Sequence, residues 1–155
     1  MDITDPEFAL SEVLPQDQEA ALTSCSIFAN DHVLVQYSRN VKDELYVYKL
    51  INGDTTGAAL ELVERITPDW IGTIYGYHAR TREQTFVGAM LVGFTSPGIA
   101  GHYDTTKPVG QRWSKLREHV VDGLKPEEFI AEQVIYIAAG VEDAIYYFLA
   151  GLVRK

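Results

Sequence analysis

The stretch PEEFIAEQVIYIAAGVEDAIYYFLAGLVRK, residues 126–155, has the clearest periodicity in the chain. Its apolar residues recur at steps of three and four, which is the spacing of one side of an α-helix. Pro126 suits a first helical turn, and Arg154 and Lys155 suit the negative end of a helix dipole. The run therefore predicts a long C-terminal helix, with a break into two helices as the alternative. The apolar stripe consists of Ile130, Val134, Ile137, Val141, Ile145, Phe148 and Leu152.

The side of this predicted helix opposite the stripe is also poor in charge. A helix that is apolar nearly all round is buried on two sides or lies in a membrane. Glu142 and Asp143 fall mid-run, where each acid would cost about 2.5–3.5 kcal/mol in a bilayer, so we expect no membrane partner. We expect a second copy or a partner protein on the second side; a helix buried within one domain is the alternative. The expected interface residues are Tyr136, Gly140, Asp143, Tyr147 and Gly151.

Length and composition indicate a single domain, residues 1–155, whose 46% hydrophobic content is enough for a core. Cys25 is the only cysteine, which excludes an internal disulfide and fits a reducing compartment. The chain opens without a basic and then apolar leader. We therefore expect a cytoplasmic protein, or one of the host cytoplasm or virion if a phage encodes it.

The formal net charge of −9 argues against a nucleic-acid partner, because nucleic-acid binders present a basic field. It suits solubility, or an acidic face offered to a basic partner. The acidic residues are scattered and form no block of like charge.

Two alternating runs joined by a short polar link predict a β-hairpin, and a second hairpin is expected around residues 81–84. The first pairs residues 32–38 with 44–51, and the second pairs residues 70–80 with 85–94. Glycine inside a strand usually marks the close approach of another element, so we expect the C-terminal helix to pack on the second hairpin. The glycines concerned are Gly72, Gly76, Gly88 and Gly93.

Four other segments carry helical spacing or helix-start signals, namely residues 5–13, 15–22, 57–66 and 111–122. Residues 95–110, TSPGIAGHYDTTKPVG, lack periodicity and predict a long loop. The element order indicates an α+β domain. In it, an antiparallel sheet of two β-hairpins, with about four to five strands, is packed by helices that include the long C-terminal helix.

The predicted loop carries the main candidate for catalysis. His102 lies two residues from Asp104, and a histidine oriented by a carboxylate can act as a general base. His78, near the end of a strand in the second hairpin, is placed to meet them. The alternative is a solvent-exposed histidine, since the spacing matches no catalytic signature.

Binding sites for small ligands have less support. The four histidines fit no metal-ligand spacing, and the glycines form no phosphate-binding motif, so we predict no metal and no cofactor. Positive charge gathers at Lys107, Arg112 and Lys115, which predicts binding of an anion or of the acidic face of a second copy. A solvated helix face is the alternative.

These observations favour a non-enzymatic, self-associating protein of bacterial or phage type that acts by assembly or by binding another protein. We expect a homo-oligomer. Two alternatives stay open. One is a small enzyme or ligand-binding protein that uses the 95–110 loop, and the other is an acidic inhibitor of a nucleic-acid enzyme.

Overall fold

The computed structural model contains ten β-strands, and no α-helix occurs among the residues it describes. Those residues are 12–40, 42–51, 58–66, 71–76, 79–96, 98–123, 125, 128–129, 131–136 and 145–149. The strands are β1 (Ala21–Phe28), β2 (His32–Arg39), β3 (Lys42–Ile51), β4 (Ala59–Ile66), β5 (Gly72–Tyr75), β6 (Phe86–Gly93), β7 (Ile99–Asp104), β8 (Trp113–Glu118), β9 (Glu132–Tyr136) and β10 (Ile145–Leu149).

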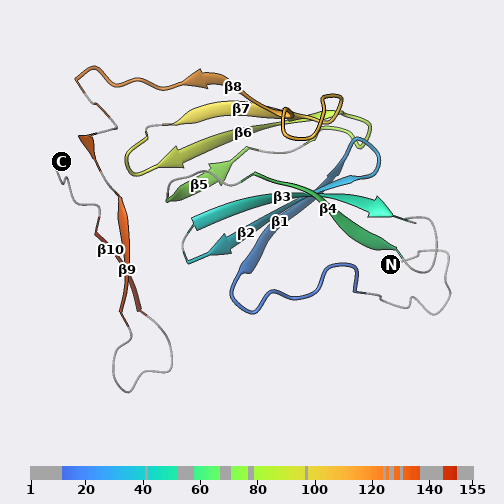
Figure 1. The fold of residues 1–155 in the computed structure, drawn as a ribbon, viewed down its shortest axis with the longest axis horizontal. Helices are drawn as coiled ribbons and strands as arrows, with labels where there is room; N and C mark the ends of the chain where they lie inside the picture. Colours follow the sequence, from blue (N-terminus) through green and yellow to red (C-terminus); the bar gives the residue numbers. More distant parts are fainter. Residues whose placement is uncertain are drawn as a thin grey trace.

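The first eight strands form two four-stranded antiparallel sheets, ordered β1-β2-β3-β4 and β5-β6-β7-β8. Each strand pairs with its neighbour in sequence, so both sheets are simple meanders. β9 and β10 pair antiparallel as a separate two-stranded sheet. Figure 1 shows the two meanders stacked one above the other.

Both predicted hairpins are confirmed, as β2 with β3 and as β5 with β6. In β2, Val33 and Val35 face one side of the sheet and Leu34 faces the other, which is the period of two expected for a strand. Asn40, between β2 and β3, has a φ of 48°, a left-handed conformation that asparagine tolerates better than most residues. The alternation and this turn residue together explain why the first hairpin was predictable.

The apolar core lies between the two sheets. The ring of Tyr103 meets that of Phe28 edge to face across the interface, with centroids 6.3 Å apart. Each fully buried apolar side chain contributes about 1.5–3 kcal/mol to the stability of such a core. The first sheet supplies Phe28, Leu34, Leu45 and Val47, and the second supplies Ile74, Val87, Ala89, Leu91 and Tyr103.

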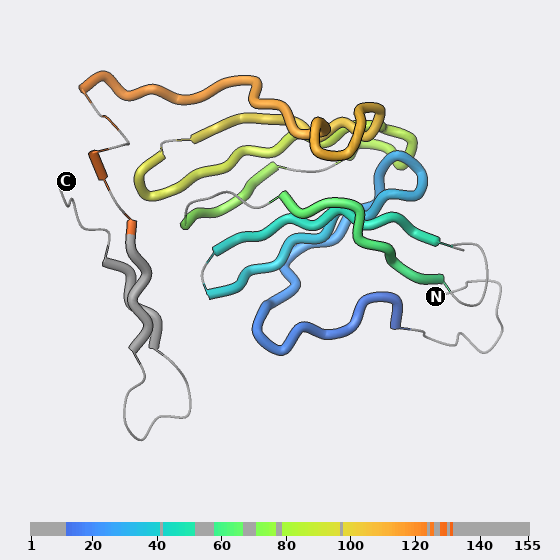
Figure 2. The backbone as a smooth tube through the Cα atoms, in the orientation of Figure 1, coloured from blue at the N-terminus to red at the C-terminus, as the bar shows by residue number. Residues whose placement is uncertain are grey.

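The far side of the first sheet has a smaller apolar cluster, centred on Val33, Val35 and Tyr37. Leu14 and Ala20, from the segment before β1, pack against it. Figure 2 shows this segment, in blue, running along the side of the first sheet that is turned away from the second. Both faces of the first sheet are therefore covered.

The prediction of a long C-terminal helix is wrong, because β9 and β10 lie in that region. Short apolar runs fit a helix or a strand equally well by spacing alone. The composition of IYYFL and of EQVIY, rich in β-branched and aromatic residues, favours strands. No helix in the described part of the chain is long and apolar enough to cross a membrane.

The helix predicted over residues 57–66 is also wrong, because residues 59–66 form β4. Leu60, Val63 and Ile66 are three residues apart, which resembles one helix face. A register shift opposite Val47 and Tyr48 leaves Val63 as an extra residue in β4. As a result Leu60 packs on the outer cluster, whereas Val63 and Ile66 pack on the core between the sheets.

The remaining helical predictions are wrong wherever the structure can be compared with them. Residues 15–20 contain no helix and lead directly into β1, and residues 111–122 contain β8. The predicted loop at 95–110 contains β7. Residues 5–11 lie outside the described part of the chain. The fold class is therefore all-β, two antiparallel four-stranded sheets rather than an α+β domain.

Close packing occurs at Gly101, whereas at Gly76 and Gly88, two of the four glycines singled out in the sequence, a Cβ would have room. A Cβ atom at Gly101 would lie 2.4 Å from Cζ2 of Trp113 and 3.0 Å from the carbonyl oxygen of Ser114. At Gly88 the nearest atom would be 3.9 Å away. The element that approaches is the neighbouring strand β8, so the expectation of a helix packed on the glycines is wrong.

Candidate functional site

His102 and Asp104, the predicted catalytic pair, lie on one face of β7, where they alternate with the buried Gly101 and Tyr103. The Oδ1 atom of Asp104 accepts hydrogen bonds from the backbone N–H of Thr106, at 3.0 Å, and from its hydroxyl, at 2.7 Å. These bonds hold the pKa of Asp104 below its usual value. The carboxylate thus shapes the turn after β7. His78 lies outside the described residues, so a catalytic role for the three stays a prediction.

The three cations of the predicted anion site each have a partner within the chain. The Nζ atom of Lys107 donates to the Ser114 hydroxyl at 3.0 Å, and Nε of Arg112 donates to the carbonyl of Lys107 at 2.9 Å. Lys115 pairs with Glu118 at 2.7 Å. These contacts organise the loop between β7 and β8 and one face of β8. Anion binding here stays a prediction.

The predicted self-association surface depends on helical spacing. Because β9 and β10 are strands, that spacing no longer supports it. Tyr136 ends β9 and Tyr147 lies within β10, so they belong to paired strands rather than to one helix face. Gly140, Asp143 and Gly151 lie outside the described residues. Homo-oligomer formation therefore stays a prediction without a located surface.

Tyr103 links the two sheets through hydrogen bonds of its hydroxyl group. Its hydroxyl donates to Oε2 of Glu64 on β4 at 3.0 Å and accepts from the guanidinium of Arg112 at 3.3 Å. Burial, reinforced by the Glu64 carboxylate, raises the pKa of Tyr103 to about 12, although Arg112 acts in the opposite sense. The phenol is therefore neutral at physiological pH, and its role is to tie β4 to β7.

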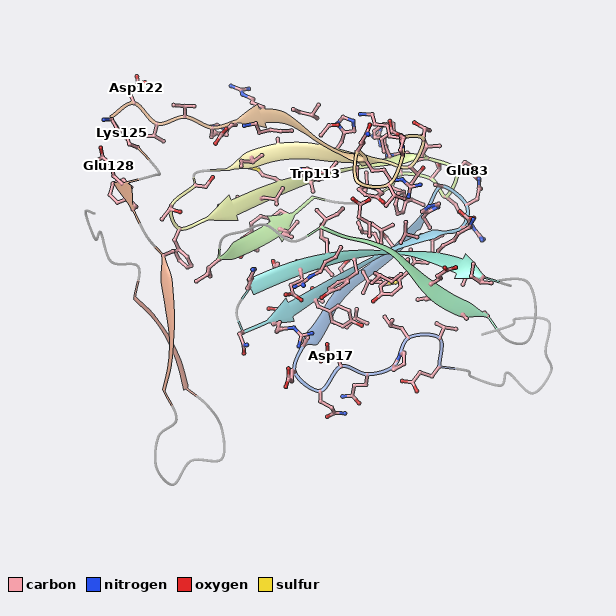
Figure 3. The ribbon with its side chains drawn as sticks, in the orientation of Figure 1. Asp17, Glu83, Trp113, Asp122, Lys125 and Glu128 are labelled. Atoms are coloured by element: carbon pink, nitrogen blue, oxygen red, sulfur yellow. The ribbon has the colours of Figure 1, made fainter. Side chains whose placement is uncertain are left out.

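Glu44 is the centre of an ionic network on the outer side of the first sheet. Its buried carboxylate accepts a hydrogen bond from the Tyr46 hydroxyl at 2.8 Å and pairs with Arg39 and Arg65. Burial alone would raise the pKa of Glu44, but Tyr46 and the two guanidiniums outweigh it and lower this pKa. Arg39 also pairs with Asp17, which Figure 3 shows on the segment along the first sheet. The network fastens that segment to the sheet.

On the face of the second sheet that points away from the first, exposed apolar side chains lie beside the polar His102 and Asp104 of β7. Tyr75 and Met90 are opposite each other in β5 and β6, and they are 56% and 36% exposed. Phe86, four residues before Met90 on the same side of β6, is 51% exposed. Small residues, Gly88 and Ala100, lie between them in the ladder. We call Tyr75, Phe86 and Met90 the outer apolar face.

Metal chemistry has no geometric support in the described part of the chain. No three side chains among its histidines, cysteines, aspartates and glutamates are grouped so that they could hold a metal ion. Two other features of the described residues remain: the hydrogen bonds that link the two sheets, and the outer apolar face.

Comparison with known proteins relates the chain to fungal peptidases. It is 40% identical over 136 residues to prolyl oligopeptidase A of Amanita bisporigera, which covers 88% of this chain and 17% of that protein. It is 35% identical over 127 residues to prolyl oligopeptidase A of Galerina marginata, covering 82% and 16%. No family model matches the chain.

The solved structures agree with these relatives. Prolyl oligopeptidase B of Galerina marginata, bound to a 35mer hydrolysis and macrocyclization substrate, superposes with a TM-score of 0.79 at 29% identity. The match covers 95% of this chain and 19% of that one. The two stacked sheets therefore match the β-propeller-like domain of a prolyl oligopeptidase. The chain spans less than a fifth of the length of these relatives.

These similarities overturn two predictions about function. The relatives are fungal, so the expectation of a protein of bacterial or phage type is wrong. The relatives are also peptidases, which contradicts the expectation of a non-enzymatic assembly protein. That expectation rested in part on a helix in the region where the structure has β9 and β10.

A signal for the repeated architecture is present in the sequence. Eight strands of four to ten residues follow one another at short intervals, which is typical of sheets built by local hairpins. A propeller is a radial series of four-stranded sheets of this kind. The fourth strand of each sheet, β4 or β8, lies in a segment that the sequence predicts as a helix, residues 57–66 or 111–122.

Proposed function

We propose that this chain forms two neighbouring four-stranded sheets of a β-propeller-like domain in a prolyl-oligopeptidase-type peptidase. The 40% identity over 136 residues to the Amanita bisporigera enzyme supports this most directly. On this proposal the whole protein acts on prolyl peptides, and the chain contributes scaffold rather than the reacting groups.

The surface properties of the chain fit such a role. The inner face of the second sheet is covered by the first sheet, and the outer face of the first sheet is covered by residues 12–20. Among the described residues, the outer apolar face of the second sheet presents exposed apolar side chains that no described element covers. A further four-stranded sheet packed on Tyr75, Phe86 and Met90 would continue the same stacking.

A chimera tests the proposal. This chain replaces the matching 136 residues of Amanita bisporigera prolyl oligopeptidase A, and hydrolysis of a prolyl peptide is measured. If the chain forms these sheets, we expect kcat/KM within about tenfold of the parent enzyme, a change of about 1.4 kcal/mol in transition-state stabilisation.

The matched control is the same chimera with Val47→Asp, which places a charge in the core between the sheets and should prevent folding. A chimera that is folded by circular dichroism and monodisperse, yet hydrolyses the peptide more than about a thousandfold more slowly than the parent, contradicts the proposal.

A further inference from the structure

β5 is an edge strand of the second sheet, and among the described residues its one ladder partner is β6. In an antiparallel pair, residues alternate between those that exchange both main-chain hydrogen bonds with the partner and those that exchange neither. Ile74, which is opposite Leu91, has both its N–H and its C=O bonded to side chains of the first sheet. Both groups therefore point away from β6, toward the side where another strand would pair.

Two side chains occupy that side. The Oδ2 atom of Asp43 accepts a hydrogen bond from the Ile74 N–H at 2.9 Å. The Nε2 atom of Gln36 donates to the Ile74 carbonyl at 3.3 Å. One acceptor and one donor thus meet the main chain of a single residue, which is the pattern that a neighbouring strand would present.

Both side chains are buried at the sheet interface, where an unpaired polar group is costly. Gln36 is 5% exposed and Asp43 is 7% exposed. Gln36 follows Leu34 on the inner face of β2, and Asp43 precedes Leu45 on the inner face of β3. Apolar residues at these two sites would leave the Ile74 amide and carbonyl without partners inside the protein.

We propose that Gln36 and Asp43 form a side-chain clamp that takes the place of a strand at the free edge of β5. The clamp also selects the register between the sheets. A shift of β5 by one residue would present Thr73 or Tyr75, whose main-chain groups point toward β6. Gln36 and Asp43 would then be buried without partners, so only one register satisfies both sheets. At Ile74 the edge is therefore closed to pairing with another chain.

Native-state hydrogen exchange of the full chain, followed by NMR, tests the clamp at the Ile74 amide. In Asp43→Ala, which removes the acceptor, we expect this amide to exchange about ten- to a hundredfold faster than in the wild type. Asp43→Asn keeps an oxygen acceptor, so exchange should stay within about threefold of the wild type. The amides of the β6–β7 ladder should be unaffected in both variants.

The matched control is Asp122→Ala, at an exposed site labelled in Figure 3, which should leave the Ile74 amide unchanged. Unchanged Ile74 protection in a folded Asp43→Ala chain overturns the proposal. If Asp43→Ala does not fold, Gln36→Leu tests the clamp instead, because it removes only the donor to the Ile74 carbonyl. We then expect Ile74 exchange to be about five- to tenfold faster, and no acceleration overturns the clamp.

Discussion

At the scale of single residues, contacts between the sheets are specified by groups that face across the interface. Tyr103 reaches Glu64, and Gln36 and Asp43 reach Ile74. None of these partners is near in sequence, so hydrophobic patterning cannot identify them. The pattern placed His102 and Asp104 in one segment, but it could not show that Asp104 is engaged in a turn with Thr106.

Gly101 gives the first prediction. Gly101→Ala places a Cβ 2.4 Å from Trp113, so the indole must move, and we expect a loss of about 1–3 kcal/mol in the free energy of unfolding. Urea denaturation measures it. Gly88→Ala is the matched control because its Cβ would meet nothing closer than 3.9 Å, and its effect should stay within about 1 kcal/mol. Equal losses in the two variants would refute the packing argument.

Glu44 gives a pH-dependent prediction. Its pKa is lowered in the folded chain from an ordinary 4.5, so its stabilising effect is complete above that value and is lost as pH falls through the folded pKa. Glu44→Gln should therefore cost about 1–3 kcal/mol at pH 7 and progressively less in the acidic range below 4.5. Urea denaturation at a series of pH values measures the difference. A cost that is the same at pH 7 and at pH 3 would rule out this origin.

At the scale of elements, alternation of polar and apolar residues predicted the hairpin of β2 and β3, whereas β6 has no polar residue and shows a period of two only in its burial. The other strands were missed for identifiable reasons. In β4 the bulge at Val63 changes the phase of the pattern halfway along the strand. In β8 a register shift opposite Ala100 and Gly101 of β7 leaves Leu116 as an extra residue, with the same consequence. Helical spacing can thus arise from an interrupted strand.

Two adjacent residues of β6 test which face is buried. Leu91 is buried in the core, and Met90 is on the outer apolar face. Leu91→Asp buries an unpaired charge, and we expect a loss of more than about 3 kcal/mol, enough to unfold a marginal domain. Met90→Asp should cost less than about 1 kcal/mol. Circular dichroism and urea denaturation of the two variants measure this, and similar losses would mean that the assigned faces are wrong.

At the scale of the whole molecule, the two sheets are joined around a single apolar core. The hydrogen bond between Tyr103 and Glu64 joins β7 to β4, and the clamp joins β2 and β3 to β5. Main-chain bonds from Ala29 and Asn30 join the turn after β1 to the segment before β6. Each sheet is local in sequence, whereas the links between sheets are not. The sequence pattern therefore predicts hairpins, but it does not predict that two sheets stack or which residues the stacked sheets expose.

A substitution on the outer apolar face tests whether a further sheet packs on this pair of sheets in a larger protein. In the chimera with Amanita bisporigera prolyl oligopeptidase A, Met90→Asp puts a charge where a further sheet should pack, and desolvating it costs several kcal/mol. We therefore expect the chimera to lose prolyl peptide hydrolysis at least about a hundredfold, although the same substitution leaves the isolated chain folded. Met90→Leu, an apolar replacement of similar volume, should retain activity within about threefold. Full activity of the Met90→Asp chimera would mean that this face meets solvent in the whole enzyme. The contrast between the folded isolated variant and the inactive chimera is what separates a docking surface from an ordinary part of the core.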